Sequence, residues 1–156
     1  MKTEAMLRAF CNAVERRDGK AFAALFTEDG RYHDVFYGSF GGRAKIADMI
    51  EDVFHRTASD FRWDMHEPVS DGETLYARYT FSYRSRLPEA QGARAMFEGV
   101  AIMTLRDGLI ASYREVAATA PAFVDMHFTP ERIAKIAARQ GAELKARPEM
   151  ARHLEP

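Results

Sequence analysis

The sequence predicts an α+β fold in which one curved sheet, antiparallel or mixed, wraps around N-terminal helices to form a cone, with an extra helix at the C-terminus. Residues Phe97–Ala117 place two apolar, strand-like runs on either side of Asp107-Gly108. This dipeptide tolerates the positive φ angles of a tight turn, so the segment predicts a hairpin. Three helical segments precede the hairpin, and two further strand-like runs lie between. Long strands twist, and helices on one face then enclose a pocket.

The helices are predicted from apolar residues that recur at helical spacing. Asp18-Gly19 ends the first of them, because both residues are poor helix formers. The three N-terminal helices are Thr3–Arg17, Lys20–Phe26 and Arg43 to about Arg56. A fourth begins at Thr129-Pro130, where Thr is a favourable N-cap and Pro a favourable first helical residue, and it runs to about Ala146.

The strands are predicted from composition and from alternation of apolar and polar residues. Arg31–Tyr37 is rich in aromatic residues and predicts a short strand, whereas the glycines of Gly38–Gly42 predict a loop. Apolar and polar residues alternate over Phe61–His66, which is the period of a half-buried strand. Thr74–Arg86 is a long β-rich run that leads to the hairpin.

The chain is expected to form one cone domain with a C-terminal addition. We expect residues 1–120 to form the cone, and residues 121–156 to form a connector, helix and tail packed on it. Phe123–Phe128 is too apolar for an exposed linker, so we expect it near the cone mouth, with the helix after Thr129 as a cover. Thr74–Arg86 carries aromatic side chains on both faces, and the helices cover only one. The uncovered face predicts a homodimer through the convex side of the sheet.

Composition excludes several classes of partner. The 156 residues include 22 Lys and Arg against 23 Asp and Glu, so no excess charge favours nucleic acid or a membrane surface. The single cysteine, Cys11, predicts no internal disulfide and a reducing compartment. The N-terminus has scattered charges and lacks the apolar core of a signal peptide, and no apolar run approaches the ~20 residues that span a bilayer. We therefore expect a cytoplasmic protein.

Two stretches of the chain share an order of residues with a known family. They are residues 9–50, AFCNAVERRDGKAFAALFTEDGRYHDVFYGSFGGRAKIADMI, and residues 97–117, FEGVAIMTLRDGLIASYREVA. Both resemble the nuclear transport factor 2-like superfamily, in its SnoaL-like polyketide cyclase and ketosteroid isomerase-like branch. The resemblance extends from about Met6 to Val116 and implies a cystatin-like α+β roll. The superfamily contains isomerases, dehydratases, cyclases, epoxide hydrolases and non-catalytic binding proteins, so the fold alone does not decide the function.

Asp34 is the candidate catalytic residue. It follows Tyr32-His33 at the position where the resemblance to ketosteroid isomerases implies a general-base carboxylate, and abstraction of a proton beside a carbonyl requires such a base in a dry pocket. The alternative is a solvated or backbone-bonded Asp at the strand end. Phe10 replaces the oxyanion-stabilising Tyr of those enzymes, and Glu98 is out of register with their second carboxyl. Ketosteroid isomerisation itself is therefore not expected.

Arg78 and Glu115 form a second candidate group. In the epoxide hydrolase branch, an Arg and an Asp two residues apart act with an Asp on the last strand to position a water. Here Thr80 replaces the middle Asp, so this water-activating set is incomplete. We expect Arg78 and Glu115 to lie within ion-pair distance inside the cone, either as a structural pair or as a pair that orients a ligand carbonyl or carboxylate.

The remaining candidates are aromatic residues that we expect either to fill the core or to line a pocket for a small apolar molecule. Phe10, Tyr32, Trp63 and Tyr113 fall on core-facing phases, as either core packing or substrate-binding residues. The five histidines show no metal-ligand spacing and Gly38–Gly42 lacks a phosphate-binding motif, so we expect no metal and no cofactor. The sequence favours a cofactor-free isomerase, cyclase or dehydratase with Asp34 as base. The alternative is a non-catalytic ligand-binding or protein-interaction domain.

Overall fold

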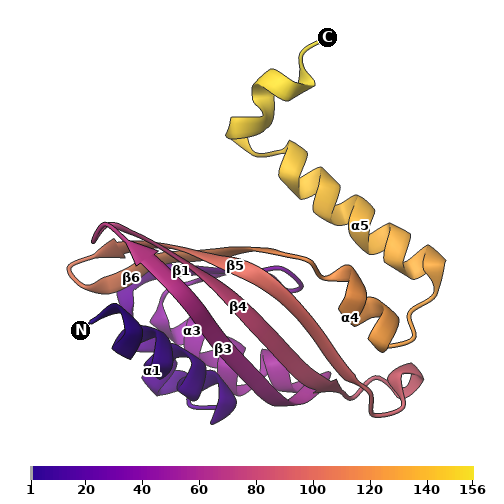
Figure 1. Ribbon diagram of the computed structural model, residues 1–156, viewed down its shortest axis with the longest axis horizontal. Helices are drawn as coiled ribbons and strands as arrows, with labels where there is room; N and C mark the ends of the chain where they lie inside the picture. The colour runs from indigo at the N-terminus through magenta and orange to yellow at the C-terminus, as the bar shows by residue number, and fades with distance from the viewer. Residues whose placement is uncertain (1) are drawn as a thin grey trace.

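A single six-stranded mixed sheet organises the chain, and the computed structural model describes residues 2–156. The strands are β1 (Phe26–Asp34), β2 (Gly38–Gly41), β3 (Ala58–Ser70), β4 (Thr74–Ser85), β5 (Arg94–Arg106) and β6 (Leu109–Ala117). Their order is β2-β1-β6-β5-β4-β3, and only the β1–β6 pair is parallel. The sheet is curved and does not close (Figure 1), which confirms the predicted α+β class.

The predicted hairpin forms the centre of this sheet. Asp107 and Gly108 have φ angles of 55° and 76°, so both adopt the left-handed conformation that the tight turn requires. β5 extends three residues beyond the predicted start at Phe97, and it pairs with β4 without interruption from Thr74 to Arg84. The hairpin prediction is confirmed.

Helices cover the inner face of the sheet. They are α1 (Thr3–Glu15), α2 (Gly19–Ala23) and α3 (Arg43–Glu51), followed by the 3-10 turn η1 (Val53–His55). Figure 1 shows α1 and α3 on the same side of the sheet. Phe10 of α1 is fully buried, with its ring centroid 5.1 Å from that of Trp63 on β3 and 5.3 Å from that of Tyr113 on β6. An aromatic core thus joins α1 to the sheet.

Three predicted boundaries around α2 and β1 are wrong. The second helix ends at Ala23, and Phe26 instead begins β1, where it pairs with Ile110 of β6 and is fully buried. The first strand ends at Asp34 and not at Tyr37 as predicted. Gly38–Gly41 is not a loop but the edge strand β2, antiparallel to β1. Burial against β6 outweighs the local helical pattern of the second segment.

The third predicted helix is shorter than expected. It ends at Glu51 because Asp52 departs from helical geometry (φ −124°, ψ −60°), and the chain continues as η1. The polar loop predicted after β4 contains a further 3-10 turn, η2 (Pro88–Ala90).

The C-terminal segment contains two helices and a final turn. The predicted connector is the helix α4 (Ala120–Asp125), and it is followed by α5 (Pro130–Lys145) and η3 (Pro148–Leu154). The Thr129 side chain accepts a hydrogen bond from the Arg132 amide, as the predicted N-cap requires. In Figure 1, α5 leads away from α4 toward the C-terminus, and none of its residues is fully buried.

Beyond the end of β6, the chain that leads into α4 and the helix itself form hydrogen bonds with β5. The Ala118 amide donates to the Glu98 carbonyl, and the Met96 amide donates to Asp125 Oδ2 at 3.1 Å. These bonds satisfy backbone groups of β5 that have lost their β6 partner. Within residues 2–156, no helix combines the length and apolar content needed to cross a bilayer.

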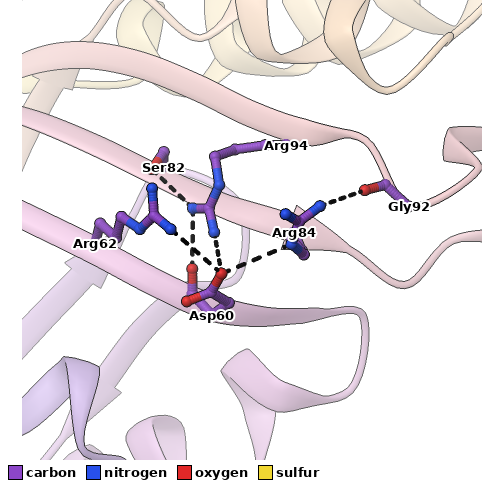
Figure 2. Close-up of polar contacts among 6 residues, drawn as sticks. All are labelled: Asp60, Arg62, Ser82, Arg84, Gly92 and Arg94. Atoms are coloured by element: carbon purple, nitrogen blue, oxygen red, sulfur yellow. Dashed lines mark hydrogen bonds and ion pairs between the residues drawn. The ribbon is translucent and has the colours of Figure 1, made fainter.

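The outer face of the sheet carries a charged cluster around Asp60, which lies at a register shift in β3. Arg62, Arg84 and Arg94 converge on its carboxylate from β3, β4 and β5 (Figure 2). Arg94 also donates to Ser82 Oγ at 2.9 Å and to the Asp60 carbonyl at 3.0 Å. We call these four charged residues the Asp60 cluster. It links three strands through their side chains.

Candidate active site

A cavity of about 240 Å³ opens among the inner face of the sheet, the β1–β2 connection, η1 and the two C-terminal helices. Half of the residues that line it are aromatic. The aromatic lining residues are Phe36, Tyr37, Phe54, Phe61, Trp63, Tyr79, Phe81, Tyr83, Phe97, Phe123 and Phe128. A mainly apolar wall with a few polar groups is typical of small-molecule sites.

Asp34 supplies one of two carboxyls in this wall. It is the last residue of β1, and its Oδ2 accepts hydrogen bonds from the amides of Phe36 (2.8 Å) and Tyr37 (3.0 Å). Both bonds engage the same oxygen, which leaves Oδ1 for other contacts. Burial raises the pKa of Asp34 to about 6, and the two amide bonds limit the rise because they favour the charged form.

Glu115 supplies the second carboxyl, from β6. Tyr113 Oη donates to Glu115 Oε2 at 2.6 Å. Burial raises the pKa of Glu115 to about 8, and the negative charge of Asp34 adds to the rise. The hydroxyls of Tyr113 and Tyr79 act in the opposite direction. Burial and the repulsion between the two charged forms therefore both favour a site that holds a proton on this pair of carboxyls.

Tyr79 reaches this region because Gly99 leaves room for it. A Cβ on Gly99 would lie 2.7 Å from Tyr79 Oη and 2.6 Å from the Val116 carbonyl oxygen. Burial raises the pKa of Tyr79, so the phenol keeps its proton. Tyr79 Oη and Trp63 Nε1 are buried donor groups of cavity-lining residues. The Tyr79 hydroxyl acts on Glu115, whereas Trp63 Nε1 has no hydrogen-bond partner within residues 2–156.

The structure brings only part of the predicted site together. Asp34, Trp63 and Glu115 line the cavity. The other three aromatic candidates, Phe10, Tyr32 and Tyr113, lie fully buried outside the lining. The rings of Tyr32 and Tyr113 stack at 4.3 Å, and Tyr113 holds Glu115 through its hydroxyl. These residues therefore support the site, and they do not form its surface.

The expected ion pair between Arg78 and Glu115 is wrong. Arg78 points to the outer face, where it contacts Glu67 at 3.2 Å and Glu98 at 3.9 Å, and 41% of its side chain is exposed. Leu75, Ala77 and Tyr79 are the buried residues of this part of β4, and Arg78 alternates with them. Glu98 is also outward, so it is not the second carboxyl of the site.

The histidines lie outside the cavity wall. His33 alternates with Asp34 along β1, and its Nδ1 bonds to Ser39 Oγ at 2.8 Å. His66 bonds to Thr80 Oγ1 and His127 to the Glu89 carbonyl, so neither reaches the site. In the described part of the chain, no group of three or more His, Cys, Asp or Glu side chains is placed to hold a metal ion.

The C-terminal segment lies beside the cavity, as its apolar residues predict, and it contributes side chains to the wall. Its lining residues are Phe123, Met126, Phe128, Arg132, Ile136 and Arg139. Met126 Sδ accepts a hydrogen bond from the hydroxyl of Tyr83 at 3.6 Å, which fastens this segment to β4. The apolar character of Phe123–Phe128 was the one signal for this contact.

Three solved structures illustrate what the chain is similar to. A protein with a ketosteroid isomerase-like fold from Catenulispora acidiphila, in complex with trimethylamine, matches with a TM-score of 0.72 and 15% identity, covering 83% of this chain and 98% of that one. An LEH-like epoxide hydrolase from M. tuberculosis matches at 0.62 and 18%, covering 86% and 93%. TerC co-crystallised with polyporic acid matches at 0.64 and 16%, covering 80% and 97%.

These identities are low, so the structural matches show the fold alone. No curated protein shows detectable sequence similarity to this chain. The model of the SnoaL-like domain matches residues 7–113, which is more than half of the chain. It includes Asp34 and ends just before Glu115. With the curved sheet, the inner helices and the buried cavity, this match shows that the chain belongs to the SnoaL-like domain family.

Proposed function

We propose that this chain is an enzyme that moves a proton on a small, largely apolar, carbonyl-bearing substrate. The observation that carries the proposal is that two buried carboxyls, Asp34 and Glu115, line one aromatic cavity, where burial raises the pKa of both and the charge of Asp34 raises that of Glu115 further. Two acidic groups with separated pKa values are a common arrangement for an acid and a base in one site. Isomerisation, aldol cyclisation and dehydration all use such a step.

The two carboxyls take different roles in the proposed step. The Asp34 carboxylate accepts a proton from the carbon next to the carbonyl, and the electron pair of that C–H bond moves to the carbonyl oxygen. Neutral Glu115 and the Tyr79 hydroxyl donate hydrogen bonds to the oxyanion that forms. Protonated Asp34 then returns its proton to the product. Phe10 lacks the hydroxyl that the resemblance implied there, and Tyr79 on β4 supplies a donor from another element.

The outward position of Arg78 favours this mechanism over epoxide hydrolysis. The water-activating arrangement considered in the sequence analysis requires an Arg inside the cone. Arg78 pairs with Glu67 and Glu98 on the outer face, and Thr80 replaces the middle acid. Proton transfer at carbon needs only the groups that line the cavity.

Exchange of hydrogen for deuterium at carbon tests the proposal directly. In D₂O we expect the chain to accelerate exchange at the α-carbon of small aryl ketones such as 2-tetralone, followed by ¹H NMR. Asp34→Asn removes the base and is expected to slow exchange by about 100-fold or more. Asp60→Asn, the same substitution in the Asp60 cluster, is the matched control and leaves the rate unchanged. Exchange no faster than in buffer, or unaffected by Asp34→Asn, contradicts the proposal.

The alternative is a domain that binds a small ligand without catalysis. An aromatic cavity with a carboxylate also suits a hydrophobic ammonium ion, since aromatic faces attract cations. The Catenulispora protein with the ketosteroid isomerase-like fold is in complex with trimethylamine. Saturable binding of trimethylamine, without accelerated exchange at any of the aryl ketones tested, would favour this alternative.

We also propose that the chain forms a homodimer through the outer face of the sheet. Exposed apolar side chains there are Val69, Tyr76, Met96, Val100 and Val116. The helices α1 and α3 lie on the opposite side of the sheet (Figure 1), so these side chains stay exposed, and apolar area of this kind favours association. Sedimentation velocity at micromolar concentration is expected to give a dimer, and a monomer at that concentration would contradict the proposal.

A further inference from the structure

One face of α5 is turned toward the cavity. Arg132, Ile136 and Arg139 all line it, and their spacing of four and three residues places them on the same side of the helix. Gln140 Nε2 donates to Thr119 Oγ1 at 3.2 Å, which fastens the helix beside α4. Although no residue of α5 is fully buried, this face forms part of the cavity wall.

The two arginines of this face differ in what they contact. Arg132 forms an ion pair with Glu89 of η2, and its guanidinium lies 3.7 Å from the centre of the Phe128 ring. Glu89 neutralises its charge, so Arg132 acts as a fastening between α5 and the wall. Arg139 makes no ion pair or side-chain hydrogen bond within residues 2–156. Its positive charge is therefore available at the cavity.

The cavity thus has opposite charge at two places in its wall. Asp34 on β1, Glu115 on β6 and Arg139 on α5 all line the same aromatic cavity. An anionic group of a ligand is repelled by the Asp34 carboxylate and attracted by Arg139. A ligand with a carbonyl at one end and an anion at the other is therefore bound in a single orientation, with its carbonyl toward Asp34.

We propose that Arg139 makes the site selective for keto acids, in which an apolar body separates the reacting carbonyl from a carboxylate. The inference rests on the proposed function for the identity of the carbonyl end. Arg139 is a specificity-determining residue here, because it binds the carboxylate of the ligand and not the reacting carbonyl. Its guanidinium suits a carboxylate, to which it presents two parallel donors.

Binding of matched acids and esters tests the proposal. The probes are ω-benzoyl alkanoates with three to seven methylene groups, each compared with its methyl ester. Trp63 is the only tryptophan of the chain and lines the cavity, so quenching of its fluorescence reports occupancy. For the chain length that binds best, we expect the acid to bind about three- to fivefold more tightly than the ester, the range of a partly exposed ion pair.

Two variants separate the role of Arg139 from a general effect of charge. Arg139→Gln is expected to weaken binding of the acid by about three- to fivefold and to leave binding of the ester unchanged. Unchanged binding of the ester also shows that the cavity of the variant is folded. Lys135→Gln, an exposed position on the same helix outside the cavity lining, keeps the preference for the acid. Higher salt is expected to reduce the preference, because it screens an exposed pair.

Several outcomes overturn the inference. They are equal affinity for acid and ester, a preference that survives Arg139→Gln, and no quenching by any acid of the series. The proposed function fails separately, in the exchange experiment with Asp34→Asn. An acid preference that depends on Arg139, without any ketone exchange, would leave the ligand selection standing and remove the catalytic step.

Discussion

Acidic side chains on the two faces of this sheet have opposite surroundings. On the outer face, Asp60 lies among three arginines, and Glu67 and Glu98 flank Arg78. Figure 2 shows the arginines turned toward the Asp60 carboxylate. On the inner face, Asp34 and Glu115 meet backbone amides and a tyrosine hydroxyl, and neither forms an ion pair within residues 2–156.

The difference shows that the sheet separates two uses of the same side chain. Arg78 lowers the pKa of Glu67 through a hydrogen bond and its charge, so that the outer carboxylate stays ionised. Inside, burial acts without a compensating cation and raises the pKa of Asp34 and Glu115. Outer carboxylates serve as ionic links between strands, whereas inner carboxyls can gain and lose protons near neutral pH.

The largest expected effect concerns catalysis by the inner pair. If Asp34 acts ionised and Glu115 acts neutral, the rate of ketone exchange rises with pH through about 6 and falls above about 8. Glu115→Ala removes the donor and is expected to slow exchange by about 100-fold. Glu115→Gln keeps a neutral donor at every pH, so it is expected to abolish the alkaline fall while retaining the acidic limb. A fall above pH 8 in Glu115→Gln would assign that limb to another group.

A smaller effect is expected on stability. The native pKa values of Asp34 and Glu115 exceed their ordinary values of 3.8 and 4.5, so the folded protein holds protons that the unfolded chain has lost. Their contribution to the free energy of unfolding therefore falls as pH rises from about 4 to about 8. Glu115→Gln is expected to remove part of this fall, on the order of 2 kcal/mol.

Urea denaturation at pH 5 and pH 8.5 measures that difference. The comparison of interest is the change between the two pH values in wild type and in Glu115→Gln, because exposed carboxylates elsewhere contribute equally to both. An identical change in the two proteins would mean that Glu115 titrates as an ordinary exposed acid.

The smallest effect is expected from the outer face. Arg78→Met removes the contacts with Glu67 and Glu98, and exposed ion pairs add little to stability. We expect no measurable shift in the urea midpoint, in ketone exchange or in quenching of Trp63 by the benzoyl alkanoates. Loss of ligand binding in this variant would indicate that Arg78 faces the cavity, and it would contradict the distinction between the two faces.

The residue pattern of β4 explains why the sequence predicts Arg78 inside the cone. Thr74–Arg86 carries aromatic residues on both phases, with Tyr76 outward and exposed and Tyr79 inward and buried. Hydrophobicity therefore does not decide which phase is buried. The pairing of β4 with β5 decides it, and that pairing is a property of the whole sheet.

The position of Asp34 could be expected from the sequence, while its surroundings could not. The resemblance placed Asp34 on the first strand, and the Asp-Gly turn placed the hairpin that contains Glu115. Tyr79 was missed because its access to Glu115 depends on Gly99, its cross-strand neighbour. A glycine in a strand signals close approach of another group but does not name that group.

The cavity wall consists of one part inside the region matched by the family model and one part, formed by the C-terminal helices, outside it. The region that the SnoaL-like family shares, residues 7–113, contains Asp34 and the strands β1 to β5 in full. α4 and α5 lie beyond it, and they join the cone through the last strand. The part of the wall formed by α4 and α5 therefore lies outside the region that the family model matches, whereas the strand that carries Asp34 lies inside it.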